Sequence, residues 1–179
     1  MLKLSQFYLI CICLVMPFST LQAEDKQAPA KMDSTRIQTL LSRLDKNVEG
    51  EKGFWQLEIA GVAVTVITDD KANRMRVISP VSSISGVEPK SLYRMMQANF
   101  DSALDARYSI AKGVIWSAFI HPLEQLSDQQ FLEGVGQVVN LVTSYGSTYS
   151  SGLLVFGGGD SGKLQRELID DLLEKGLAI

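Results

Sequence analysis

One stretch of the chain has the residue types and spacing of a phosphate-binding loop. Gly157 to Lys163 (GGGDSGK) matches the pattern G-x-x-x-x-G-K, follows an apolar run and precedes a predicted helix. In a P-loop, backbone N–H groups and a helix N-terminus hold phosphate, and a Ser or Thr after the Lys holds magnesium. Here Leu164 follows Lys163, and the 16 residues after Lys163 are too few for a nucleotide-binding βαβ unit. We interpret the stretch as a glycine-rich hinge, with phosphate or small-molecule binding as the alternative.

The single histidine and a pair of acids are the other candidates for acid–base chemistry. His121 stands beside Pro122 at a predicted strand end, with no Ser or Cys nucleophile at a recognisable spacing. Asp101 and Asp105 are four residues apart and share a helix face, as paired carboxylates would. We interpret the histidine as structural and the acids as solvated. One histidine also excludes metal sites that need two imidazoles, and we expect neither a metal, a cofactor nor an enzyme.

The charge balance argues against a nucleic-acid partner. The chain has 17 Lys and Arg against 20 Asp and Glu, a net charge of −3 and a pI near 5.2. A nucleic-acid binder needs a basic face. Arg74 and Arg76 share one face of a predicted strand and could bind an anion or an acidic partner, although a solvent-facing strand surface explains them equally simply.

Two groups of large apolar residues could bind protein. Met95 and Met96, with Tyr93 and Phe100, could form an adaptable peptide-binding surface on a helix, but we favour a place in the core.

The second group lies on the predicted strand from Val114 to Ile120, which is apolar on both faces. Trp116 and Phe119 point to opposite faces of this strand, so one face packs under helices and the other needs a cover. We therefore name Trp116 and Phe119 as the candidate protein interface, and the sequence leaves a homodimer open.

The first 23 residues have the features of a cleaved secretory signal peptide. Lys3 supplies the positive charge, Phe7 to Phe18 is an apolar segment too short for a comfortable membrane span, and Ala23 is a small residue at the expected cut. Cys11 and Cys13 lie inside the apolar segment and leave with it, so the mature chain has no thiol. We expect a periplasmic or secreted protein that is not inserted in a membrane after cleavage.

The rest of the chain alternates helical and strand-like periods. The expected elements are a helix over 34–48, strands at 54–59, 62–66 and 74–78, a helix from 89, strands at 106–110 and 114–120, a helix from 127 and a last helix over 163–175. The third strand is closed by Pro80, and a tight hairpin turn falls at Ala111-Lys112-Gly113. Gly134 and Gly136 inside the third helix indicate close packing against another element.

This order, α-βββ-α-ββ-α plus a C-terminal helix, predicts an α+β fold of two layers with an antiparallel sheet. We expect a signal peptide over 1–23, a linker over 24–32, the α+β domain over 33–150, and a hinge with the C-terminal helix over 151–179.

The segment from Leu92 to Val142 resembles the YbjN-like family of bacterial regulators. It has a helix ending in the pair Asn99-Phe100, a hairpin with the sequence ARYSIAKGVIW, and the turn HPLEQLS before a long helix. The resemblance extends over about Asp33 to Tyr149. It implies a type III secretion chaperone-like fold and a non-enzymatic, protein-binding role. Secretion chaperones of this fold are acidic homodimers that hold an extended client segment in the cytosol, and the predicted signal peptide departs from that pattern.

Overall fold

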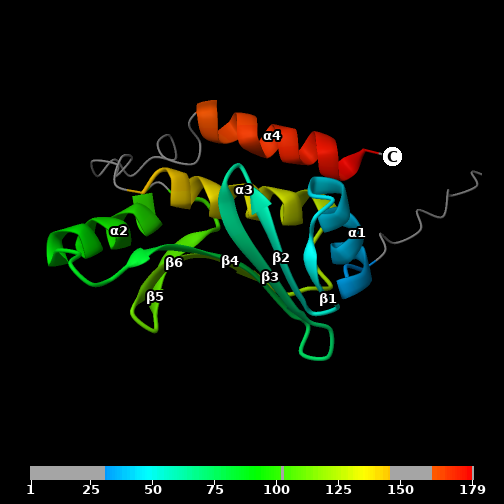
Figure 1. Cartoon of the computed structure of the whole chain (residues 1–179), viewed down its shortest axis with the longest axis horizontal. Coiled ribbons are helices and arrows are strands. Elements are labelled where there is room, and N and C mark those ends of the chain that lie inside the picture. The colour runs from blue at the N-terminus through cyan, green and yellow to red at the C-terminus, as the bar shows by residue number, and fades with distance from the viewer. Residues whose placement is uncertain (1–30, 102, 146–162, 179) are drawn as a thin grey trace, which may run out of the picture.

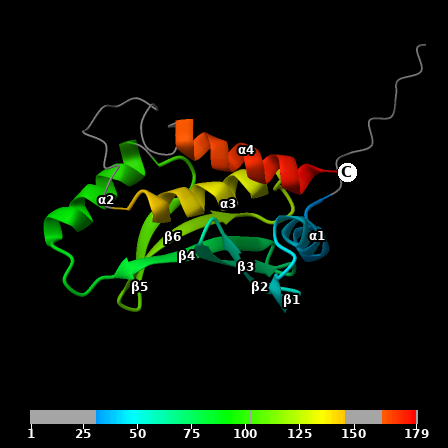
Figure 2. The ribbon, with the colours of Figure 1, turned by 45° about the horizontal axis from the view of Figure 1, so that its top comes forward.

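The computed structural model describes residues 31–101, 103–145 and 163–178. Six antiparallel strands form one sheet in the order β1-β2-β3-β4-β6-β5, and α3 and α1 pack on one face of it (Figures 1 and 2). The elements are α1 (Ser34–Leu44), β1 (Glu49–Glu51), β2 (Phe54–Ile59), β3 (Val62–Asp69), β4 (Arg74–Ser83), α2 (Pro89–Asp101), β5 (Arg107–Ala111), β6 (Val114–His121), α3 (Asp128–Thr143) and α4 (Lys163–Leu177). The predicted α+β class, with an antiparallel sheet covered by helices, is confirmed.

The predicted meander of three strands is present as β2, β3 and β4. In β2, Trp55, Leu57 and Ile59 are buried under the helices while the residues between them are exposed, as the period of two indicates. The hairpin between β5 and β6 is also confirmed. Ala111 pairs with Val114, and Lys112 and Gly113 form the two-residue turn with positive φ angles of 51° and 75°.

Two strand predictions are corrected. A short strand, β1, precedes the meander and pairs with β2. β4 does not end at Pro80 but continues to Ser83, paired with β6 and with a register shift between Pro80 and Ser82. The register of β3 with β4 ends at Ile78, so Pro80 lies where β4 has only one partner strand and its missing N–H costs no ladder bond there.

The glycines of α3 allow it to pack closely on both sides. A Cβ atom on Gly134 would lie 2.6 Å from the ring of Phe119 in β6, and one on Gly136 would lie 2.6 Å from Ile169 in α4. The predicted close packing is therefore confirmed. Because the sheet covers one side of α3 and α4 covers the other, even Gln137 and Asn140 of this helix are buried.

The C-terminal helix belongs to the same packed body as the sheet. Ile169 and Leu172 of α4 are buried, and Leu132 of α3 fills the space beside Gly176. The C-terminal helix therefore shares one core with the sheet and α3, although we expected a boundary between it and the domain. The expected hinge at 151–162 lies outside the described residues. At the other end, Met32 of the predicted linker is 2% exposed, so packing begins before residue 33.

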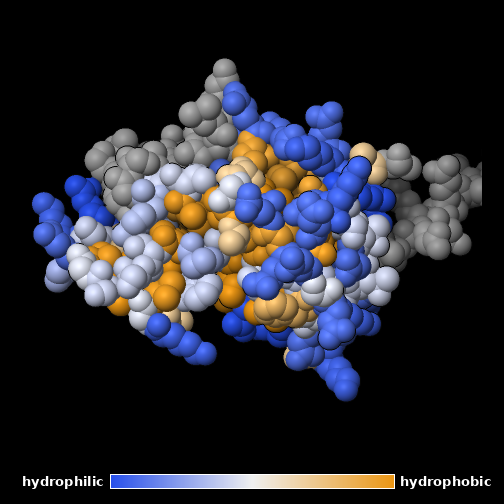
Figure 3. Space-filling model, in the orientation of Figure 1, coloured by the Kyte–Doolittle hydropathy of each residue, from blue (hydrophilic) through white to orange (hydrophobic). Residues whose placement is uncertain are grey.

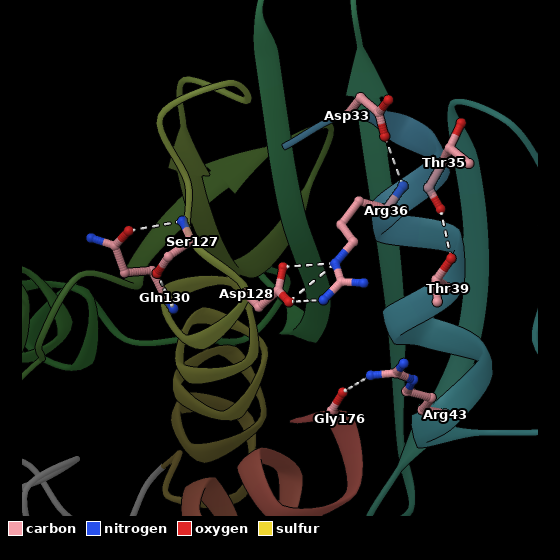
Figure 4. Close-up of polar contacts among 9 residues, drawn as sticks. All are labelled: Asp33, Thr35, Arg36, Thr39, Arg43, Ser127, Asp128, Gln130 and Gly176. Atoms are coloured by element: carbon pink, nitrogen blue, oxygen red, sulfur yellow. Dashed lines mark hydrogen bonds and ion pairs between the residues drawn. The ribbon is translucent and has the colours of Figure 1, made fainter. Parts of the chain in front are cut away.

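Polar contacts fix α1 against the rest of the structure (Figure 4). Asp33 caps the helix by accepting from the backbone N–H of Arg36, and the Arg36 guanidinium binds both carboxylate oxygens of Asp128 at the start of α3. Near the other end of α1, Arg43 donates to the backbone carbonyl of Gly176 in α4 at 2.9 Å. Three helices that are distant in sequence are thereby joined by arginines of α1.

A buried hydroxyl cluster ties the start of α1 to the sheet. The hydroxyls of Ser34 and Thr68 lie 2.6 Å apart, and Asp70 accepts from the Ser34 hydroxyl at 2.8 Å and from its backbone N–H at 3.0 Å. Burial alone would raise the pKa of Asp70, but these hydrogen bonds, together with Lys52, hold it below the usual value.

We expect Gly134→Ala to lower the free energy of unfolding. Overpacking against the Phe119 ring costs about 1–3 kcal/mol, which outweighs the roughly 1 kcal/mol that alanine gains in a helix interior. Urea unfolding measures the difference, with Gln129→Ala on the exposed side of α3 as the control. A Gly134→Ala variant more stable than the parent would contradict the close approach.

We expect Asp70→Asn to destabilise the protein at neutral pH and to weaken the dependence of stability on pH. Because the folded-state pKa of Asp70 lies below that of the unfolded chain, its contribution is present above the unfolded-state pKa and is lost as the pH falls through the folded-state pKa. Urea unfolding across the acid range measures this, with the exposed Glu58→Gln as the control. Parallel pH profiles for Asp70→Asn and the parent would contradict the role given to the Ser34 cluster.

Candidate protein-binding surfaces

The residues considered for acid–base chemistry do not form a catalytic group in the described part of the chain. His121 ends β6, where its Nδ1 lies 2.7 Å from the carbonyl oxygen of Pro122 and its ring stacks on Phe119 with centroids 6.0 Å apart. Asp105 accepts from the buried Gln137 side chain, while the side chain of Asp101 lies outside the described residues. Among the described residues, no group of three or more His, Cys, Asp or Glu could hold a metal.

The glycine-rich loop cannot be placed, because Gly157 to Gly162 lie outside the described residues. Lys163 opens α4, but its side chain is not described either, so phosphate binding stays untested. The same holds for the predicted signal peptide, including Cys11 and Cys13. Within the residues that are described, no helix is both long and apolar enough to cross a membrane.

A hollow of about 660 Å³ lies between the start of α1 and the start of α3. Its lining carries both positive and negative charges, with Lys31 and Arg36 beside Asp33 and Asp128. Arg36 already binds Asp128 across it (Figure 4), and Lys31 binds Glu124 at 2.8 Å. Both cations are therefore neutralised within the chain, which fits a structural junction better than a ligand site.

The two candidate interface residues of β6 differ in burial and lie on opposite faces of the sheet. Phe119 is 4% exposed and lies under α3 beside Gly134, so its side chain belongs to the core and is not available to a partner. Trp116 is half-buried on the opposite face of the sheet, where its indole N–H donates to the carbonyl of Ala111 at 3.2 Å. Trp116 and Phe119 lie on opposite faces of the strand, as predicted. The prediction that Phe119 lies at an interface is corrected. A binding role for Trp116 stays a prediction.

The apolar residues of α2 divide between two sides of the helix, and the expectation that they all belong to the core is wrong. Met95 is 1% exposed and faces the core, but Tyr93, Met96 and Phe100 are 66%, 49% and 73% exposed. These three recur at i, i+3 and i+7 and therefore form one stripe, which we call the α2 stripe. The sequence could not assign the sides because apolar residues occur around more than half of this helix.

The free edge of β5 is capped by a side chain of α2. Asn99 accepts from the backbone N–H of Tyr108 at 2.7 Å and donates to its carbonyl oxygen at 3.0 Å, as a neighbouring strand would. Gln137 accepts from the backbone N–H groups of Asp105 and Ala106 just before the strand. These contacts occupy groups that could otherwise pair with another chain.

The opposite edge strand of the sheet, β1, is protected from pairing in a different way. β1 has only three residues, and both Glu49 and Glu51 are exposed and charged. Short, charged edge strands resist pairing with other strands. Gly50 has a φ of 107° and its Cβ position lies 2.3 Å from the carbonyl oxygen of Phe54, so no other residue fits there. Both edges of the sheet therefore carry features that oppose pairing with a strand of another chain.

In the sequence, Asn99 stood out only as part of the Asn99-Phe100 pair in the resemblance to the YbjN-like family, and its capping role was not predicted. A polar residue four positions after a core methionine, on the same side of a helix, is the signal that could have shown a buried hydrogen-bonding role.

Comparison with known proteins shows the fold. No protein-family model and no curated protein matches the chain. The structure of the Yersinia pestis type III secretion chaperone SycH in complex with a stable fragment of YscM2 contains a chain similar to this one. Its TM-score is 0.50 and its identity 14%, over 63% of this chain and 98% of that chain. The predicted type III secretion chaperone-like fold is thereby confirmed.

Two further complexes contain chains with weaker similarity. A chain of the HopA1-SchA chaperone–effector complex has a TM-score of 0.47 and 14% identity, over 63% of this chain and 94% of that chain. A chain of the ExsC-ExsE complex has a TM-score of 0.45 and 16% identity, over 62% of this chain and 92% of that chain.

We expect Asn99→Ala to open the β5 edge without unfolding the domain. The backbone N–H of Tyr108 loses its acceptor, so its amide exchanges faster with deuterium. The exchange rate of this amide measures the effect, with Gln97→Ala on the same helix as the control. Asn99→Asp keeps the acceptor but loses the donor, so it should protect the Tyr108 N–H better than Asn99→Ala does. Unchanged exchange in Asn99→Ala would contradict the cap.

Proposed function

We propose that this chain is an exported, non-enzymatic domain that binds an apolar segment of another protein through the α2 stripe. The observation that carries the proposal is the exposure of Tyr93, Met96 and Phe100 on one side of a helix whose other side is already packed. Large apolar side chains grouped in this way on a surface are typical of protein-binding sites.

The chemistry of the stripe favours a segment that inserts apolar side chains. A methionine between two aromatic residues offers an adaptable surface, because its unbranched thioether side chain can follow different partner shapes. Tyr93 and Phe100 supply large contact areas at a small cost in side-chain entropy. The partner is therefore expected to be an apolar or amphipathic segment and not a highly charged one.

The shared fold supports a protein-binding role. SycH, a type III secretion chaperone, was solved with a fragment of YscM2 bound to it. In the present chain, the Asn99 cap and the charged β1 oppose the addition of a strand at either edge of the sheet. The proposed client therefore lies against a helix face.

Export and the finer family relationship are parts of the same proposal. The apolar segment from Phe7 to Phe18 and the small residue Ala23 support cleavage of a signal peptide and a periplasmic location. The Asn99-Phe100 pair and the hairpin that follows it support kinship with YbjN-like proteins. N-terminal sequencing of the chain from its own host should give Glu24 as the first residue, and an intact Met1 would refute the cleavage.

The client surface is tested by site-specific photocrosslinking at Met96, with the full chain expressed in its own host. We expect a discrete crosslinked partner that is lost or reduced at least about tenfold in Phe100→Ser, because removing a large interface aromatic costs more than about 1.4 kcal/mol of binding. Arg94→Ser is the matched control, since Arg94 is also exposed on α2 and receives the same replacement. Equal crosslinking in both variants, or none in the parent chain, would refute the α2 stripe as the client surface.

A further inference from the structure

A second hollow, which we call the α4 hollow, lies where α3 and α4 meet the loop between α2 and β5. Its volume is about 360 Å³. Figure 3 shows hydrophilic residues of α4 along the upper margin of the molecule, with apolar residues below them. The α4 hollow combines both kinds of residue, because Leu104 and Ile169 line it together with charged side chains and the buried Gln137.

Four charged side chains line the α4 hollow, from β5 and the loop before it, from α3 and from α4. Two are positive and two are negative: Arg107, Arg166, Asp105 and Glu133. Within the described part of the chain, none of them forms an ion pair. In the hollow beside α1, by contrast, both cations are already bound to carboxylates. The charges of the α4 hollow are therefore not neutralised in pairs and remain available to a ligand.

Two of these charges are held in place by uncharged groups. The Arg107 guanidinium donates through Nη1 to the backbone carbonyl of Ala106 at 2.9 Å and to that of Leu104. The buried Gln137 side chain donates to the Asp105 carboxylate at 3.3 Å and accepts from the backbone N–H groups of Asp105 and Ala106. These contacts orient a guanidinium and a carboxylate at the hollow without cancelling their charges, which is how a binding site is organised in advance.

The other two charges come from the two helices that enclose the hollow. Glu133 of α3 accepts from the uncharged side chain of Gln129 at 2.8 Å. Arg166 of α4 is exposed and has no hydrogen-bond partner among the described residues. Each sign of charge is therefore contributed once from a helix and once from the segment that leads into β5.

We propose that the α4 hollow binds a small zwitterion, namely an aliphatic α-amino acid or a dipeptide. The ligand carboxylate binds Arg107 and Arg166, because a guanidinium can hold a carboxylate through two parallel hydrogen bonds. The ligand ammonium group donates to the carboxylates of Asp105 and Glu133. The aliphatic side chain of the ligand contacts Ile169.

The balance of charges is the reason to assign a zwitterion. A ligand of one charge sign would meet two side chains of the same sign in this hollow, which opposes binding. A ligand without charge would leave all four side chains unpaired. A zwitterion meets a partner of opposite charge at each of its ends.

The volume of the hollow limits the ligand to a small molecule. Ligand pockets in proteins measure about 300–1,000 Å³, and the α4 hollow lies near the lower end of that range. The inference does not depend on client binding, because no residue of the α2 stripe lines this hollow.

NMR titration of the whole isotope-labelled chain, as its host produces it, tests the proposal with two probes, L-leucine and leucyl-leucine. The backbone amides of Asp105 and Ala106 are the reporters, since both donate to Gln137 in the wall of the hollow. We expect saturable shifts with at least one probe. The same compound should bind at least about tenfold more weakly as its C-terminal amide or its N-acetyl derivative, because each lacks one charge. The two probes distinguish an amino-acid site from a dipeptide site.

Two variants test which side chains hold each end of the ligand. Arg166→Gln should weaken binding at least about tenfold and remove most of the preference for the free carboxylate over the amide. Glu133→Gln should instead remove most of the preference for the free ammonium group over its acetylated form. Arg94→Gln is the matched control, since Arg94 is exposed on α2 and outside the hollow. Circular dichroism establishes that all three variants stay folded.

Three results would overturn the proposal. The first is the absence of saturable shifts with either probe at millimolar concentrations. The second is equal affinity in Arg166→Gln and Arg94→Gln. The third is equal binding of the zwitterion and its amide to the parent chain, which would show that the arginines do not recognise the carboxylate.

Discussion

The close approach of α3 to both of its neighbours is the constraint on which the rest of the structure depends. Gly134 admits the ring of Phe119 on one side of the helix, and Gly136 admits Ile169 on the other. Side chains at these positions would force Phe119 and Ile169 to shift and would loosen the contact of α3 with the sheet and with α4. Because α3 occupies the middle of this stack, the helical packing is concentrated on one face of the sheet. The opposite face and the outer side of α2 are left for other contacts.

The two edges of the sheet show how the fold limits unwanted pairing. Asn99 uses one carboxamide to replace a missing neighbour strand at Tyr108, whereas β1 relies on its shortness and on its glutamates. These edge features oppose one kind of association, while the exposed apolar residues leave another kind possible. Strand addition, which any extended polypeptide could make, is discouraged, while contacts that depend on particular side chains remain available.

Much of the fold could be predicted because its signals are local. The period of two in β2 and the turn at Lys112-Gly113 each act within a few residues, and the structure contains both features. The glycines of α3 indicated close packing, but their neighbours, Phe119 and Ile169, lie in other elements of the chain. The continuation of β4 past Pro80 depends on which side of that strand has a partner, and this information lies in β3 and β6, far along the chain.

The candidate surfaces were harder to predict for the same reason. Phe119 and Phe100 are both aromatic residues among other apolar side chains, yet one is in the core and the other is 73% exposed. The difference depends on whether a helix lies opposite, which periodicity alone does not show. The sequence could divide Trp116 and Phe119 between two faces of a strand but could not say which face the helices cover.

The positions of the two tryptophans give the protein separate optical reporters. Trp55 is fully buried and its indole N–H donates to Gln38 of α1, so its emission follows the integrity of the core. Trp116 lies half-buried on the sheet face opposite α3, so its emission would respond to the exclusion of water from that surface. A chain with phenylalanine at either position would therefore isolate one signal, so folding and surface contact could each be followed in a single-tryptophan variant without an added dye.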